Sequence, residues 1–122
     1  MSSDLFEPAA VPRWADGLPA AITVTDAHGT IIAMNARAGE TFAADGGAAL
    51  VGRSVFECHP EPARSKLRAL YAQPAPSHYT IRKRGARKII HQIPWYAGGA
   101  FAGLVELSIP IPDEMPHFER GD

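Results

Sequence analysis

The residues best suited to chemistry lie in one short segment, Cys58-His59-Pro60. A thiolate at the start of a helix is stabilised by unpaired backbone N–H groups, which makes such a cysteine reactive. Thiolate and imidazole also bind haem iron and other transition metals. Three roles stay open for Cys58: a small apolar side chain in the core, a haem or metal ligand, and a redox-active thiol.

The histidines offer few ways to bind a metal. His59 could hydrogen-bond a backbone carbonyl or orient its loop instead of binding a metal. His91 alternates with Ile89 and Ile93, so we expect its side chain to point inward from a strand. Because Cys58 and His59 are adjacent and no two histidines have the spacing of metal ligands on a helix, we expect no structural zinc site.

Composition and motifs exclude several function classes. The chain has 122 residues and a net charge of −1, which gives no general attraction to nucleic acid or to an anionic membrane. The basic residues between positions 82 and 88 have no aromatic residues among them, so we interpret them as a solvated hairpin tip: Arg82, Lys83, Arg84, Arg87 and Lys88. No nucleophile elbow, phosphate loop, zinc-protease motif or dinucleotide fingerprint is present. We therefore expect a protein that is not an enzyme and does not bind nucleic acid.

The single cysteine excludes an internal disulfide and favours a reducing compartment. No apolar run reaches the length of a membrane span, and no secretory signal is visible at the N-terminus. From these features we expect a cytoplasmic protein without membrane contact.

The elements that must position these residues begin with a hairpin over residues 20–35. Ile22 and Val24 alternate with threonines, which is typical of a strand. A turn from Asp26 to Gly29 follows, the strand resumes over residues 30–33, and Asn35 is suited to cap a helix over residues 35–44.

Two further helices are expected in the centre of the chain. Ser54 could cap a very short helix that ends at Glu57. A longer helix should start at Pro60 or Pro62 and carry its apolar residues on one face: Ala63, Leu67, Leu70 and Tyr71.

Three strands are expected in the last third of the chain, over residues 77–83, 87–96 and 100–109. Strict alternation places Phe101 and Val105 on one face of the last strand. Because a two-stranded hairpin cannot close a core alone, we expect it to join these strands in one antiparallel sheet covered by helices on one face, an α+β fold.

This order of elements resembles the PAS domain family. Three stretches carry the resemblance: I-T-V-T-D-A-H-G-T-I-I-A-M-N from Ile22, L-V-G-R-S-V-F from Leu50, and G-G-A-F-A-G-L-V-E-L-S from Gly98. Cys58-His59-Pro60 adds a narrower resemblance to bacterial PAS domains with this motif after the short central helix. The resemblance implies a five-stranded antiparallel sheet in the order 2-1-5-4-3 with helices over its concave face.

The same resemblance implies a site and partners. A small ligand would bind between sheet and helices, against Phe42, Val55, Phe56, Cys58, His59, Leu67, Tyr71 and His91. The function expected is a stand-alone sensory or interaction domain that signals through a homodimer or through contacts with another signalling protein. Two alternatives stay open: a haem or redox sensor that uses Cys58 or His59, and an interaction module whose core is filled and binds no ligand.

The expected domain bounds follow from the proline-rich ends. Residues 18–111 would form the PAS-like domain. Residues 1–17 would be a flexible or dimer-contacting segment, in which Phe6, Val11 and Trp14 are apolar enough to pack on the domain or on a partner. Residues 112–122 would be a polar tail with two docking side chains, Met115 and Phe118.

Overall fold

The computed structural model describes residues 7–121, which contain one five-stranded antiparallel sheet in the order β2-β1-β5-β4-β3. The strands are β1 (Ala21–Thr25), β2 (Ile31–Met34), β3 (Ser77–Lys83), β4 (Ala86–Ala97) and β5 (Ala100–Ile111). β5 pairs with both β4 and β1, so the first hairpin joins the last three strands. The predicted fold class and strand order are therefore confirmed.

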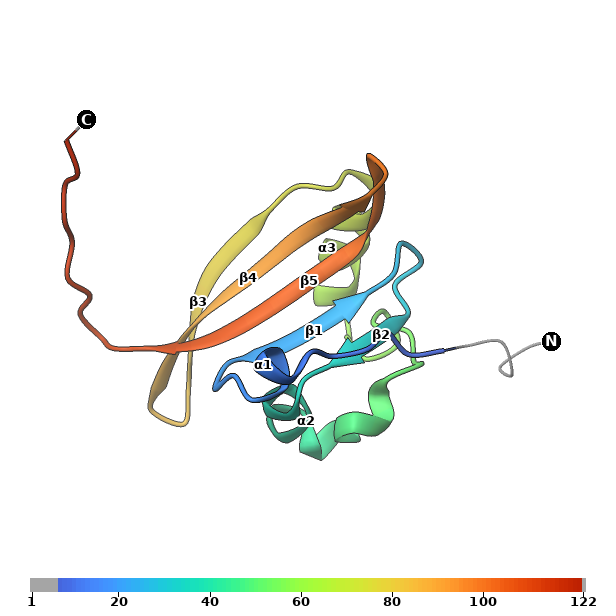
Figure 1. Ribbon diagram of the computed structural model, residues 1–122, viewed down its shortest axis with the longest axis horizontal. Helices are drawn as coiled ribbons and strands as arrows, with labels where there is room; N and C mark the ends of the chain where they lie inside the picture. Colours follow the sequence, from blue (N-terminus) through green and yellow to red (C-terminus); the bar gives the residue numbers. More distant parts are fainter. Residues whose placement is uncertain (1–6, 122) are drawn as a thin grey trace.

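The helices are short and lie on different sides of the sheet (Figure 1). They are α1 (Arg13–Asp16), α2 (Ala36–Thr41), the 3₁₀ turns η2 (Ala43–Asp45) and η3 (Gly47–Leu50), and α3 (Ala63–Ala72). In Figure 1, α3 lies behind the sheet and α1 in front of it. We call the face toward α3 the inner face and the face toward α1 the outer face.

The segment that follows η3 runs along the free edge of β2 instead of forming the predicted short helix. Ile31 N–H donates to the carbonyl of Arg53 over 2.9 Å, and Val55 N–H donates to the carbonyl of Gly29 over 2.7 Å. Residues 55–58 then form consecutive turns. Because the backbone of the segment is held by β2, the side chains after Ser54 are fixed relative to the sheet.

Three residues of the hairpin motif have separate structural roles. Asp26 Oδ1 accepts hydrogen bonds from the N–H groups of His28 and Thr30 over 2.9 and 3.0 Å, which closes the turn. Gly29 has a φ of 87°, and a Cβ there would lie 2.4 Å from the ring of Phe56. Asn35 is buried and caps α2 by accepting from Ala38 N–H over 3.0 Å.

The core lies between the inner face and α3. Phe56, Leu67 and Leu104 form its buried centre. Half-buried apolar side chains pack against this centre: Val55, Leu70, Tyr71 and Phe101. The rings of Phe56 and Tyr71 meet edge to face at 5.0 Å, so the turn after Ser54 and helix α3 are joined through aromatic contact.

Phe101 lies on the inner face, contrary to the prediction that it shares a face with Val105. Its ring centroid is 5.9 Å from that of Tyr71 on α3. The pairing of β4 with β5 shifts register between Trp95 and Tyr96, where Trp95 opposes Gly103 and Tyr96 opposes Phe101. Such a bulge inserts one residue into the alternation, so side chains beyond it change faces.

The terminal segments of the described chain differ in their contacts. Val11 is half-buried beside β1 on the outer face, whereas Trp14 is 71% exposed. Phe6 lies outside the described residues. The C-terminal tail extends away from the sheet (Figure 1), and its Met115 and Phe118 side chains are 57% and 68% exposed.

Within residues 7–121, no helix is both long enough and apolar enough to cross a membrane.

Candidate functional site

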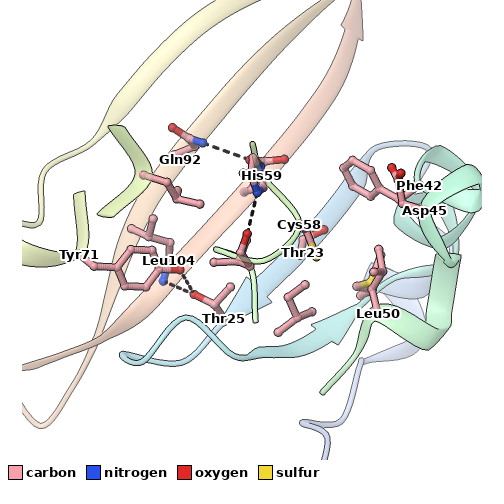
Figure 2. Close-up of a pocket in the computed structure, with 15 residues that line it drawn as sticks. Thr23, Thr25, Phe42, Asp45, Leu50, Cys58, His59, Tyr71, Gln92 and Leu104 are labelled. Carbon is pink, nitrogen blue, oxygen red and sulfur yellow. Dashed lines mark hydrogen bonds between the residues drawn. The ribbon is translucent and has the colours of Figure 1, made fainter. Parts of the chain in front are cut away.

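A cavity of about 220 Å³ lies between the inner face of the sheet and the segments that cover it. Its floor comes from four strands, and its cover comes from α2, the 3₁₀ turns, the turn around Cys58 and α3 (Figure 2). The apolar lining consists of Ile31, Met34, Phe42, Leu50, Val55, Leu67 and Leu104, and the other side chains are Thr23, Thr25, Asp45, Cys58, His59, Tyr71, Gln92 and Glu106. A mostly apolar space with a few polar groups is the usual character of a small-molecule site.

The structure brings six of the eight predicted site residues to this cavity: Phe42, Val55, Cys58, His59, Leu67 and Tyr71. Phe56 is instead only 9% exposed in the core, where it packs against Gly29 and Tyr71. It therefore supports the wall of the site without lining it.

His91 lies on the outer face, so the prediction that it points inward is wrong. Gln92, the next residue in β4, lines the cavity, and neighbouring side chains of a strand point to opposite faces. His91 pairs across the strands with His78, and their Nδ1 atoms are 2.7 Å apart. The alternation itself was predicted correctly, but the sequence did not show which face is inner.

The two residues of the Cys-His-Pro motif have different environments. His59 Nδ1 lies 2.7 Å from the carbonyl oxygen of Val55. Because a carbonyl can only accept, Nδ1 carries the proton and donates, and Nε2 of the neutral ring keeps a free lone pair. Cys58 is exposed to solvent, and its thiol donates to the carbonyl of Ser54 over 3.4 Å.

Thr25 organises the polar end of the cavity, a role that the sequence analysis missed. Its hydroxyl accepts from Leu104 N–H over 3.2 Å and shares a short hydrogen bond with the Tyr71 hydroxyl (Figure 2). Its carbonyl accepts from the indole N–H of Trp95 over 3.0 Å. Thr25 therefore connects β1, β4, β5 and α3 at one point.

The pKa of Tyr71 is raised above its ordinary value. Burial of the phenol is the main cause, and the negative charges of Asp26 and Glu106 act in the same direction. The hydrogen bond with Thr25 opposes the shift. Tyr71 is therefore a neutral hydrogen-bonding group at physiological pH, with no role as a base.

Gln92 and Glu106 form a second polar pair that the sequence analysis did not include. They are paired residues on β4 and β5, and the Gln92 amide donates to Glu106 Oε1 over 3.2 Å. The available signal was Glu106 itself, a carboxylate in the apolar run Leu104-Val105-Glu106-Leu107 of a central strand.

A wider groove of about 520 Å³ adjoins the cavity between α3 and strands β3 and β4. The two spaces share His59, Leu67 and Gln92 on their borders. Lys66 and Tyr79 lie only on the groove side. The side chains of these three shared residues therefore separate the groove from the cavity.

No group of three or more His, Cys, Asp or Glu side chains in the described part of the chain is arranged to hold a metal ion.

Comparison with known proteins identifies the family. The family model for the PAS fold matches residues 15–88, more than half of the chain. The chain belongs to the PAS fold family. The match begins in α1 and ends in β4, so it includes the hairpin motif, the cavity cover and α3.

Solved structures of other proteins share this architecture. The PAS domain of BvgS from Bordetella pertussis is 25% identical, with a TM-score of 0.58 and coverage of 80% of this chain and 81% of that one. A C-terminal domain from Streptococcus mutans has a TM-score of 0.64 at 18% identity, with 78% of each chain covered. The Aer2 receptor from Vibrio cholerae, described as a dual PAS-haem oxygen sensor, has a TM-score of 0.57 at 18% identity and coverage of 76% and 95%. None of the curated proteins compared matches the sequence.

Proposed function

We propose that this PAS domain is a non-enzymatic sensor that binds a small molecule in the cavity between the sheet and α3. The observation that carries the proposal is the cavity itself, which lies beside the core and is lined by both apolar and polar side chains. Its volume of about 220 Å³ lies below the roughly 300–1,000 Å³ of drug-sized sites, so the ligand is small.

Ligand binding would act on the rest of the domain through α3. Tyr71 connects this helix to the sheet through its bond with Thr25 and its contact with Phe101, and to the turn after Ser54 through Phe56. A ligand beside Tyr71 changes the position of α3 only if it binds two arrangements of the helix with different affinity. Such a shift is the proposed signal to a partner.

Native mass spectrometry with two matched variants tests this proposal. Val55→Phe adds a ring to the cavity wall, whereas Val51→Phe makes the same change at a half-buried residue that does not line the cavity. We expect a mass excess on the wild-type chain and on Val51→Phe, and its loss in Val55→Phe. A wild-type mass equal to the chain mass, with no thermal stabilisation by a library of small molecules, would count against the proposal.

The proposed partner contact is a second copy of the chain through the outer face. Apolar side chains gather there on the central strands: Ile22, Val24, Ile89, Ile93, Val105, Leu107 and Ile109. Ile93 is 36% exposed, and the N-terminal segment covers only the part of the face near β1 and β2. The other side chains of this set are half-buried, and an apolar face that keeps exposed surface is typical of an interface.

Light scattering of the variant Ile93→Lys tests the dimer. This change places a charge on the outer face and should give monomers where the wild type gives dimers. Deleting residues 1–16 is a less specific test, because Ala15 provides a carbonyl that Asn35 binds. A monomeric wild type at high micromolar concentration would contradict the dimer and leave the ligand proposal standing.

A haem sensor is the second candidate, because His59 presents a free Nε2 to the cavity while Nδ1 is held by Val55. This is the orientation of a metal-binding histidine whose other nitrogen donates to a carbonyl. The rest of the site does not fit haem, since the cavity is small and its lining within residues 7–121 includes no Lys or Arg to pair with the propionates. Visible absorbance that is lost in His59→Ala would favour haem over the first candidate.

The narrower subtype with Cys-His-Pro after the central turns is also a proposal, supported by the position of Cys58 and His59 on the cavity wall.

A further inference from the structure

The Asp and Glu side chains that line the cavity are negatively charged, and this charge favours a cationic ligand. Of the described residues that line it, Glu106 and Asp45 carry carboxylates, and none is Lys or Arg. Asp45 is exposed at the rim, whereas Glu106 is half-buried on the inner face of β5. An anionic ligand would therefore meet a carboxylate at the inner end of the site and no cation among these lining residues.

Glu106 lacks a cationic partner within the part of the chain that the structure describes. Its one hydrogen bond comes from the neutral amide of Gln92, over 3.2 Å to Oε1. No Lys, Arg or His nitrogen of these residues lies within 4.0 Å of its oxygens. Burying part of a carboxylate costs free energy unless an opposite charge or further hydrogen-bond donors interact with it. Glu106 can therefore bind a donor from a ligand.

The other polar groups of the cavity also favour a donor. With Nδ1 donating to the carbonyl of Val55, the neutral form of His59 has its lone pair on Nε2. The hydroxyls of Thr25 and Tyr71 are already joined to each other, and Thr25 also receives Leu104 N–H. Glu106 and the Nε2 atom of a neutral His59 are therefore acceptors that a donor from a ligand can reach.

The remaining lining suits the body of such a ligand. The rings of Phe42 and Tyr71 border the cavity, and aromatic faces attract a nearby ammonium group. The volume of about 220 Å³ exceeds the roughly 150 Å³ of an engineered cavity that holds benzene. A single ring or short alkyl body with one amino group fits these limits.

We propose that the cavity binds a small primary amine, protonated at neutral pH, whose ammonium group pairs with Glu106 and whose apolar body lies against Leu67, Leu104 and Tyr71. This inference rests on the proposed function and names the ligand class for the same site. Lys66 lines the adjoining groove and does not line the cavity, so the charged side chains of the cavity lining remain acidic.

Three probes with one skeleton and different charges test the ligand class: benzylamine, benzyl alcohol and benzoate. Binding is measured by titration with ¹H–¹⁵N NMR, which locates the site through the amide shifts of Gln92, Leu104 and Glu106. We expect benzylamine to bind at least about tenfold more tightly than the other two, because a hydrogen bond to a charged group is stronger than a neutral one. Added salt should weaken benzylamine and leave benzyl alcohol nearly unchanged.

Matched variants assign the preference to Glu106. Glu106→Gln keeps the shape of the side chain and should weaken benzylamine about tenfold, which removes most of its advantage over benzyl alcohol. Glu57→Gln, a change at an exposed residue that does not line the cavity, should leave all three affinities unchanged. The wild-type comparison of the three probes stands even if Glu106→Gln fails to fold.

Two results would overturn the inference. If benzyl alcohol or benzoate binds the cavity as tightly as benzylamine, the amine class is wrong and the sensor proposal is unaffected. If none of the probes shifts the amide signals of the cavity, the amine class is also wrong. The sensor proposal is then decided separately, by whether native mass spectrometry shows a mass excess on the wild type that Val55→Phe loses.

Discussion

The backbone of Gly103 in β5 lies against the carbonyl oxygen of Thr25 in β1, so closely that a Cβ on Gly103 would stand 1.9 Å from that oxygen. Gly103 also has a φ of 146°, a conformation that other residues rarely adopt. The close approach is part of the register shift in β5 and lets Thr25 bond Trp95 and Leu104.

Replacing Gly103 with alanine should lower the free energy of unfolding by about 3 kcal/mol or more, because the clash is with backbone and cannot be relieved by a side-chain rotation. Gly99→Ala is the matched control, since Gly99 has a φ of 82° but no atom within 4 Å of its added Cβ. The control should cost about 1 kcal/mol in urea unfolding. Equal costs would show that the close approach to Thr25 has no energetic consequence.

The amide of Asn35 joins α1, β1 and α2. Its Nδ2 donates to the carbonyls of Ala15 and Ala20 over 2.8 Å each, and its Oδ1 accepts from Ile22 and Ala38. Asn35→Ala leaves these buried groups without partners and should cost about 3 kcal/mol in urea unfolding.

Asn35→Asp separates the two halves of this network, because it keeps an acceptor and loses both donors. Its carboxylate would face two carbonyl oxygens, so we expect this variant to be less stable than wild type at pH 7 and to recover in part at pH 4. An Asp variant as stable as the wild type would contradict the role given to Nδ2.

The phenol of Tyr71 should make stability depend on alkaline pH. Burial raises its pKa in the folded state, while the unfolded chain ionises near about 10. The unfolded state therefore loses its proton first, and the stabilisation that is complete below about pH 10 declines as the pH rises through the folded pKa. Tyr71→Phe should flatten the fall in melting temperature that sets in above about pH 10.

Tyr79 acts in the same direction, because burial and then the charge of Glu106 raise its pKa. Tyr96→Phe is the control, since this side chain is 55% exposed. An identical alkaline profile for wild type and Tyr71→Phe would show that the phenol ionises alike in both states.

The ion pair between Arg82 and Asp113 attaches the C-terminal tail to the β3–β4 hairpin. The Arg82 guanidinium donates to Asp113 Oδ1 over 2.7 Å and holds the pKa of this carboxyl below its usual value. This attachment of the tail is present above about pH 4 and is lost as the pH falls through the lowered pKa of Asp113. Asp113→Asn should loosen the tail, seen as slower transverse NMR relaxation of residues 114–121. Because the pair is exposed, the change should leave the urea midpoint at pH 7 unchanged.

Local patterns in the sequence determined most of the fold. The alternation in the strands, the turn residues Asp26 and Gly29, and the cap at Asn35 act over a few neighbouring residues, so their effects can be read without tertiary contacts. The prediction of β3 over residues 77–83 matches the structure. Six of the predicted site residues reach the cavity because they belong to the apolar faces of the helix and turns that cover the sheet.

Tertiary structure decided the features that depend on which face of a strand is covered. Alternation separates His91 from Gln92 but is symmetric, and only the position of α3 makes Gln92 the inner residue. The register shift in β5 likewise turned Phe101 inward. This shift lies beside the backbone contact between Gly103 and Thr25, two residues that are far apart in the chain. The charge of the cavity followed from the same choice, since Glu106 reaches it only by lying opposite Gln92 on the covered face.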